Sequence, residues 1–281
     1  MAERVDTRAF PAPTTRAGGS RGEALSGDRL DRAAQILGGA TALGVLAMLY
    51  MALIYAPTEL TQGPAQRIFY IHIGSAIITY VAYAVTCVAS IGYLWRRAEA
   101  WDMLARASGE VGLLLNTILL LSGAIWGKAI WGTWWSWDAR LTSTLILWFI
   151  YAGYLMLRSY GGNTPQIARS AAVVGIIGVI DIPIINQSVR WWRTLHPAPI
   201  VERANPALPP EMLQAMFVAL LAFLILYAFL TVQRFRVEQL SAIIGQLRQD
   251  VLFLDDESVG AAPVASLSVE RQSALNAATE D

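Results

Sequence analysis

Cysteine, histidine and charge are all scarce in this sequence, and each shortage excludes classes of protein. The 281 residues include one cysteine and two histidines. A single cysteine cannot form an internal disulfide, and without a Cys-x-x-Cys-His motif the chain is not itself a c-type cytochrome. Only 15% of the residues are charged, against about a quarter in ordinary globular domains. The net charge is zero, so no basic surface suggests a nucleic acid as partner.

Catalytic and targeting motifs are missing as well. The sequence has no nucleophile–base pair, phosphate-binding loop or metal motif, so we expect a protein that is not an enzyme. Residues 1–32 are rich in Arg, Gly, Ser and Pro and are predicted to be a disordered extension. They lack the apolar core of a signal peptide, and their acidic residues argue against a mitochondrial transit peptide.

Hydrophobic residues, in contrast, make up 55% of the chain and gather in long runs. Five runs are typical of membrane-spanning helices, and a sixth is interrupted by a charge. We therefore predict an all-α integral membrane protein built as a six-transmembrane-helix bundle. The predicted spans are 33–56, 73–95, 111–130, 141–157, 170–187 and 212–232.

These spans divide the chain into three parts: the extension 1–32, the membrane domain 33–232, and a C-terminal helix with an acidic tail, 233–281. Leu240, Ile244 and Leu247 recur at helical spacing, which predicts that a helix continues beyond the last span. Fifteen of the 21 Lys and Arg residues lie on the side of the membrane that holds both termini. The positive-inside rule makes that side the cytoplasm.

The Trp-rich outer loop, residues 126–143, is the most unusual stretch. An aromatic belt at the membrane–water boundary needs only one or two rings at each helix end. Flat indole faces separated by small residues favour a platform for a flat, apolar ligand instead, although the belt remains an alternative. The five tryptophans are Trp126, Trp131, Trp134, Trp135 and Trp137.

The two histidines fall on the predicted side of the Trp-rich loop, His72 where the second span begins and His196 in the third outer connection. Either one alone is as readily explained as a satisfied polar residue. Two imidazoles beside several indole rings suggest an iron porphyrin, whose two axial positions suit imidazole. Arg67 and Arg140 lie in the same layer, where they would pair with its propionates. A zinc site is less favoured, because two histidines leave a tetrahedral set incomplete.

Three motifs resemble those of the haem exporter protein C family (CcmC/HelC), which carries the Trp-rich WWD signature. The motifs are Q-G…R-I-F-Y-I-H at 62–72, W-G-T-W-W-S-W-D-A-R-L-T-S at 131–143 and P-I-I-N-Q-S-V-R-W-W-R-T-L-H at 183–196. The resemblance covers residues 33–232. One departure is Gly74, where the family commonly has Pro. The N-terminal extension and the acidic tail are not part of the family's pattern.

The resemblance implies a protein of c-type cytochrome biogenesis in the bacterial cell inner membrane. Such a protein holds haem b, non-covalently and transiently, on the periplasmic face and delivers it to a CcmE-type periplasmic haem chaperone. The further partners implied are a CcmA/CcmB-type ABC transporter, a small CcmD-type membrane protein and membrane lipids. His72 and His196 would be the axial ligands of the haem iron. The platform and docking surface would be Trp131, Trp134, Trp135, Trp137 and Asp138.

The competing interpretation is a membrane subunit of a small-solute transporter with no haem site. Its sign in the sequence would be a charged or broken helix near the middle of the membrane. Asp181, followed by Pro183, is the one candidate. An ionisable residue within a span is a functional hypothesis by default, but we expect this one near the outer interface, where hydration is cheap.

Overall fold

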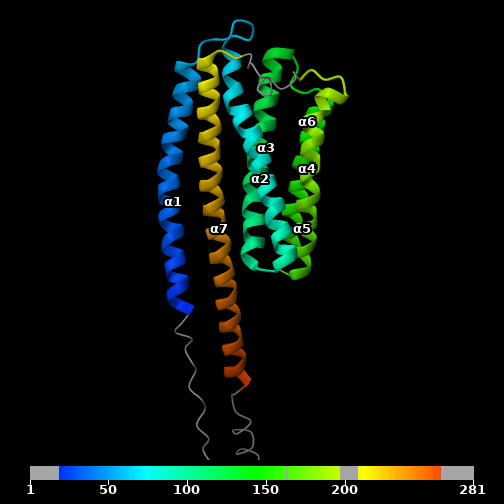
Figure 1. The fold of residues 1–281 in the computed structure, drawn as a ribbon. Helices are drawn as coiled ribbons and strands as arrows, with labels where there is room; N and C mark the ends of the chain where they lie inside the picture. The colour runs from blue at the N-terminus through cyan, green and yellow to red at the C-terminus, as the bar shows by residue number, and fades with distance from the viewer. Residues whose placement is uncertain (1–18, 163, 197–207, 261–281) are drawn as a thin grey trace, which may run out of the picture. The chain divides into compact units, whose positions relative to one another are not determined.

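The structure is a computed structural model that describes residues 19–162, 164–196 and 208–260. Their helices follow one another along the chain (Figure 1), and the described residues contain no β-strand. The elements are α1 (Gly19–Tyr50), a π-helical turn η1 (Met51–Tyr55), a 3-10 turn η2 (Pro64–Arg67), α2 (Ile68–Arg96), α3 (Glu99–Trp131), α4 (Ala139–Tyr160), α5 (Pro165–Val179), α6 (Asp181–Trp191) and α7 (Pro210–Gly260).

Six helical segments of the described chain are long and apolar enough to cross a membrane. A bilayer core needs roughly 20 apolar helical residues, and the shortest of these segments, Ala139–Tyr160, has 22. The prediction of an all-α chain with six spans is therefore confirmed. The chain divides into two compact units. The first ends at Arg234, and the second begins at Phe235, inside α7.

Two helices begin earlier than the sequence predicted. α1 starts at Gly19, so residues 19–32 are helical instead of disordered, while residues 1–18 lie outside the described part. α3 starts at Glu99, so most of the polar stretch predicted as a loop is its first turns. Adding a residue to a helix that already exists costs little compared with starting one, so polar residues with good helix propensity extend a neighbouring apolar helix.

The fifth span is not one continuous helix. α5 ends at Val179, and α6 begins at Asp181 after a break at Ile180. Pro183 has no N–H to donate to the carbonyl of Val179, four residues earlier, so the regular hydrogen-bond ladder cannot pass through this point. The prediction of one helix over 170–187 missed this break.

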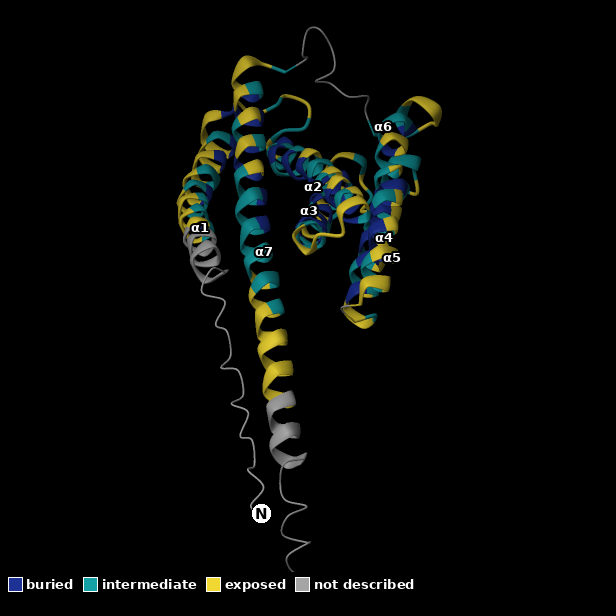
Figure 2. Ribbon diagram, turned by 60° about the horizontal axis from the view of Figure 1, so that its bottom comes forward, coloured by how far each residue is buried: buried dark blue, intermediate teal, exposed yellow. Residues whose placement is uncertain are grey.

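Two buried clusters hold the membrane-spanning unit together (Figure 2), and α2 contributes to both. The first joins the end of α1 and the turn η1 to α2, α3 and α7. The second joins α2 to α4, α5 and α6, with Tyr83 stacked on Tyr151 at a centroid distance of 3.5 Å. Burial on both sides makes α2 the central helix of this unit.

Close helix approach in both clusters relies on glycines that face aromatic rings. A Cβ added at Gly74 would lie 2.5 Å from Phe223 Cδ2, and one at Gly112 would lie 2.6 Å from Tyr83 Cε1. Both separations are far below van der Waals contact, so these rings occupy the space that a side chain would need.

The connections between helices define two ends of this unit (Figure 1). The ion-pair end carries the α2–α3 and α4–α5 connections, and it takes its name from Asp102 of α3, which accepts two hydrogen bonds from the guanidinium of Arg158 of α4. Further along α3, Glu110 pairs with Arg234 of α7 and lies 3.5 Å from Arg106. The opposite end carries the η1–η2 and α3–α4 connections and the end of α6, and we call it the histidine end.

The second unit begins within α7, as the predicted helical continuation of the last span. Its apolar side chains Val237, Leu240, Ile244, Leu247 and Val251 are all exposed. Figure 2 shows this exposure along the second part of α7.

Candidate functional site

Hydrogen bonds at the C-terminus of α3 and at the N-terminus of α4 fix the two ends of the Trp-rich loop. Gly132 adopts a left-handed conformation, with φ of 75°, and its N–H donates to Lys128 O at 3.2 Å, which ends α3. Asp138 is the N-cap of α4, because its Oδ1 accepts from the Leu141 N–H at 2.9 Å. The loop between these ends is therefore only Thr133–Trp137.

Asp138 also joins this loop to the segment that carries His196. Its second oxygen, Oδ2, accepts a hydrogen bond from Thr194 Oγ1 at 2.9 Å. Thr194 Oγ1 in turn accepts from the backbone N–H of His196 at 3.1 Å. One carboxylate thus sets the start of α4 and, through one hydroxyl, the backbone at His196. No contact between Asp138 and Arg140 accompanies these bonds among the described interactions.

His72 lies in the second turn of α2, facing α3. Its Nδ1 is 3.2 Å from Ser122 Oγ, and its ring meets that of Trp126 edge to face, with centroids 5.5 Å apart. Trp126 is fixed by its own N–H, which donates to Gln62 Oε1 at 3.1 Å. A Cβ at Gly123 would lie 3.0 Å from His72 Cε1, so the glycine leaves room for the imidazole.

His196 lies beyond α6, against the start of α4 and the end of α3. Arg140 Nη1 is 3.1 Å from its Nδ1, and its ring is edge-on to Trp131 at 6.3 Å between centroids. Arg140 also lies close enough to Tyr80 of α2 to interact with it electrostatically. His196 and Arg140 are close enough to His72 to interact with it electrostatically. The structure therefore brings both histidines to one end of the unit, each beside a tryptophan of α3.

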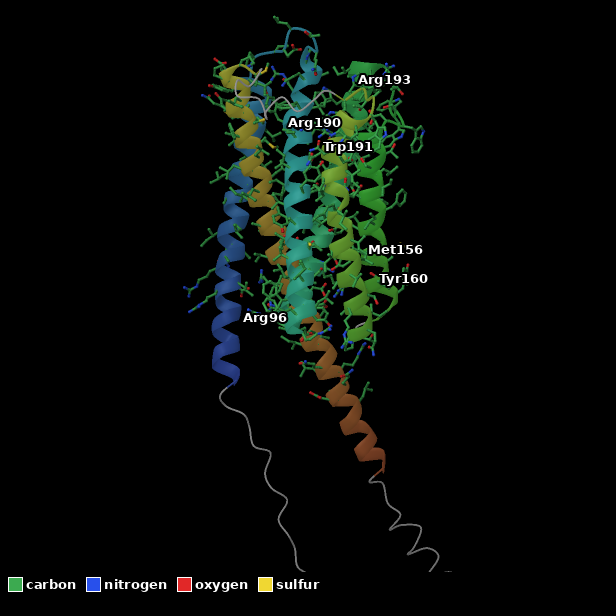
Figure 3. The ribbon with its side chains drawn as sticks, turned by 45° about the vertical axis from the view of Figure 1, so that its right-hand side comes forward. Arg96, Met156, Tyr160, Arg190, Trp191 and Arg193 are labelled. Carbon is green, nitrogen blue, oxygen red and sulfur yellow. The ribbon has the colours of Figure 1, made fainter. Side chains whose placement is uncertain are left out.

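The remaining predicted residues divide between this site and its surroundings. Trp134 and Trp137 are exposed, at 59% and 78%, and Trp137 meets the half-buried Trp135 edge to face at 5.7 Å. The Trp135 indole N–H is buried and has no hydrogen-bond partner among the described residues. Arg190, Trp191 and Arg193 lie at the same end, opposite Arg96 and Tyr160 (Figure 3).

Arg67 is turned toward the first span and contacts neither histidine in the described interactions. Its Nη1 donates to Ala52 O at 2.7 Å, and its Nη2 donates to Thr58 Oγ1 at 3.4 Å. The π-helical register of η1 pairs Met51 O with Ala56 N, so Ala52 O would pair next with residue 57. That residue is Pro57, which has no N–H, and Arg67 satisfies the carbonyl in its place.

Sequence reasoning missed the polar residues that hold the two histidines. Ser122 lies four residues before Trp126, so helical spacing places both on one face of α3, which is a usable signal. Thr194 lies two residues before His196, within reach of a side-chain-to-backbone bond. Gln62 precedes a glycine in a loop, and nothing in its local pattern indicates that it fixes Trp126.

The chemistry of this site suits a flat ligand that brings its own metal. No group of three or more His, Cys, Asp or Glu side chains that could hold a metal ion occurs in the described part of the chain. Two imidazoles alone leave a tetrahedral metal site incomplete, but they supply the two axial positions of an iron porphyrin. The donors in the neighbourhood are indole, hydroxyl and guanidinium groups, which suit an apolar ring with anionic substituents.

A family model described as heme exporter protein C matches residues 26–249. The chain belongs to the heme exporter protein C family. A protein of that name from Haemophilus influenzae is 39% identical over 190 residues, which cover 67% of this chain and 77% of the relative. The one from Bradyrhizobium diazoefficiens is 36% identical over 214 residues, or 75% of this chain and 81% of the relative. A putative cytochrome c biosynthesis ccmC-like mitochondrial protein of Marchantia polymorpha is 33% identical over 195 residues, covering 69% and 83%.

These matches confirm the family that the three motifs predicted. The matched residues include the Trp-rich loop and both histidines, and they extend past the last span into the second part of α7. Six helices able to span a membrane make the chain a multi-pass membrane protein of this heme exporter family.

Proposed function

We propose that this protein binds haem on the periplasmic face of the bacterial inner membrane and passes it to a CcmE-type haem chaperone. The haem would be haem b, held non-covalently and transiently, so it is cargo and not a resident cofactor. Support comes from the relatives, whose names refer to heme export and to cytochrome c biosynthesis. A CcmA/CcmB-type ABC transporter and a small CcmD-type protein complete the proposed set of partners.

The observation that carries this proposal is the pair of histidines from separate segments, each held at Nδ1 and each beside a tryptophan of α3. The hydrogen bond at Nδ1 of His72 orients its imidazole so that the other nitrogen, Nε2, would reach the metal. His72 would bind one face of the iron porphyrin and His196 the other. The small residue Gly123 beside His72 and the rings of Trp126 and Trp131 would flank a flat ligand there.

The other predicted residues take different parts in this proposal. Arg140, and Arg67 after turning from Ala52 O, would bind the haem propionates, since guanidinium and carboxylate form strong paired hydrogen bonds. Trp134 and Trp137 expose indole surface, which supports a role in docking the chaperone. Asp138 would serve by fixing the loop and the backbone of His196.

The transporter alternative draws on the helix break at Ile180, beside Asp181. Asp181 and Arg140 are both close enough to Tyr80 to interact with it electrostatically. The charge therefore adjoins the site that contains His196, which favours a supporting role there over a separate solute pathway. In the proposed function the chain holds and orients haem, and any part in its covalent attachment to the chaperone is assisting, so it is not an enzyme.

Purified protein titrated with ferric haem tests this function directly. We expect a bound species with a low-spin spectrum, as two imidazole nitrogens give. His72→Ala and His196→Ala should each convert it to a five-coordinate or water-ligated species with lower haem content. A wild-type spectrum in both variants would show that other residues bind the iron. If wild-type protein takes up no haem, the proposed function is wrong.

A further inference from the structure

The neighbours of His72 Nδ1 favour a hydrogen on that ring nitrogen. Ser122 Oγ donates its single hydrogen to Leu119 O at 3.1 Å. Toward His72 Nδ1, 3.2 Å away, the same oxygen can therefore only accept. His72 Nδ1 then carries the hydrogen, and Nε2 of the neutral ring has its lone pair available. His72 is in the tautomer that binds a metal through Nε2.

The bond at Nδ1 of His196 fixes the opposite tautomer. Its partner is Arg140 Nη1, at 3.1 Å, and a guanidinium is always charged and has no acceptor. His196 Nδ1 must therefore accept, which leaves the hydrogen of the neutral ring on Nε2. A ring nitrogen that carries hydrogen has no lone pair to give to iron, so His196 cannot coordinate through Nε2 while this bond persists.

We propose that Arg140 holds His196 in its non-coordinating tautomer until a carboxylate of the bound porphyrin takes Arg140 over. Ligation by His72 would then need only the iron, whereas ligation by His196 would need a propionate as well. This inference rests on the proposed binding of haem, and it concerns the order and the conditions of ligation.

The hydrogen-bond partner of Arg140 favours this exchange, and the carboxylate of Asp181, which lies near Tyr80, has no bond to the guanidinium among the described interactions. The partner that the guanidinium bonds, His196 Nδ1, is neutral, and so is the nearby hydroxyl of Tyr80. A carboxylate is a better acceptor, because it carries a negative charge and can accept two parallel hydrogen bonds from one guanidinium. Once Arg140 has moved, His196 loses the hydrogen on Nε2 and gains one on Nδ1. The ring stays neutral, and no proton is consumed or released overall.

Ligation by His196 that depends on a propionate suits haem as a cargo that must be released. When the carboxylate departs, Arg140 returns to Nδ1 and the lone pair of Nε2 is lost again. The iron is then held by His72 alone, and one of its axial positions is open to an incoming group of another protein.

The test compares ferric haem with its dimethyl ester, which has the same iron and ring but no carboxylates. With wild-type protein in detergent, we expect haem to be low-spin and six-coordinate, and the ester to bind in a high-spin form with His72 as its only protein ligand. Electronic absorption and electron paramagnetic resonance report the spin state. If the ester is also low-spin in wild-type protein, the inference is overturned.

Three variants separate Arg140 from general effects of charge. Arg140→Met removes the donor, so the ester should become low-spin, and adding His196→Ala should return it to high-spin. Arg140→Lys keeps a charged donor, so the ester should stay high-spin, while the affinity for haem can fall because lysine lacks the paired donors of a guanidinium. Arg193→Met is the matched control, because it removes an exposed arginine at the same end (Figure 3).

The outcomes also separate this inference from the proposed function. Haem bound with a low-spin spectrum, together with an ester that stays high-spin in folded Arg140→Met, would overturn the inference and leave haem binding intact. Failure of wild-type protein to bind either compound would overturn both. If Arg140→Met does not fold, the spin states of bound haem and bound ester in wild type and in Arg140→Lys still test whether ligation by His196 needs a carboxylate.

Discussion

Two arginines at one end of the membrane unit have partners of a different charge from those of two arginines at the other end. At the ion-pair end, Arg158 is bonded to Asp102, and Arg234 to Glu110. At the histidine end, Arg140 is bonded to an imidazole, and Arg67 to a carbonyl and a threonine hydroxyl. The first pair of arginines is neutralised within the fold, whereas the second keeps its positive charge.

This difference separates charges that hold the fold from charges that serve a ligand. A buried arginine with a carboxylate completes an interaction between helices, and losing either partner leaves an uncompensated charge. An arginine on neutral acceptors is satisfied in its hydrogen bonds but can still gain from an anion. Each prediction below tests this division.

The largest effect should follow from breaking an ion pair. Arg158 is 8% exposed, and Arg158→Ala leaves the Asp102 carboxylate without its partner, at a cost of about 3–5 kcal/mol in the free energy of unfolding. Thermal or denaturant unfolding in detergent measures it, and the haem spectrum of the remaining folded protein should be unchanged. Arg169→Ala, at an exposed site on α5, is the control. A loss of haem ligation in folded Arg158→Ala would contradict the division.

At the histidine end, Arg67→Met should act on affinity more than on stability. Losing a charge-assisted bond to a propionate costs about 1.5–3 kcal/mol, which corresponds to a roughly 10- to 150-fold higher Kd for haem. Arg67→Lys keeps the charge and should recover most of this loss. Equal affinities of the Met variant and wild type for haem would remove Arg67 from the site.

Replacing Trp126 and Trp135 by Phe should weaken haem binding to different extents, because the indole N–H of Trp126 is hydrogen bonded and that of Trp135 is buried without a described partner. Trp126→Phe loses the bond to Gln62 and should weaken haem binding by about 0.5–1.5 kcal/mol. Trp135→Phe loses an N–H that has no partner among the described residues, so its effect should be smaller. Trp→Ala at either position should be worse than Phe, because it removes the aromatic surface. Equal effects of Phe and Ala at both positions would instead implicate the N–H groups.

The smallest effect should come from Asp138→Asn. Asparagine is as good an N-cap as aspartate, and its amide can still bond to Thr194, so stability and haem affinity should change by about 0.5 kcal/mol or less. Asp138→Ala removes both bonds and should cost about 0.5–2 kcal/mol in stability. A large loss of haem transfer in Asp138→Asn alone, with normal haem binding, would show that its charge matters to a partner.

The sequence predicted the six spans, the shared side of the two histidines and the Trp-rich segment, because each depends on local composition or on the order of elements. Hydrophobic runs identify spans without knowledge of their neighbours. Two spans separate His72 from the Trp-rich loop, and two more separate that loop from His196. An even number of crossings places all three on one side of the membrane, whatever the packing.

The contacts that orient the site could not be predicted in the same way. The roles of Ser122 and Thr194 depend on tertiary contacts. Ser122 meets His72 because α2 packs on α3, and Thr194 meets Asp138 because the start of α4 lies near the end of α6. The polar start of α3 appeared to be a loop because its partner, Arg158, is 56 positions from Asp102 along the chain. Such long-range pairs override local preference, and a single sequence does not reveal them.

Gly74 and Phe223 together set a limit on how this chain can diverge. The ring occupies the space of a missing Cβ, so even alanine at position 74 would meet an atom 2.5 Å away unless α7 shifts. A related chain with proline at the equivalent of Gly74 therefore requires a smaller side chain at the equivalent of Phe223, or a wider spacing of α2 and α7. The two positions should change as a pair during evolution, although 149 residues separate them and neither contacts a histidine in the described interactions.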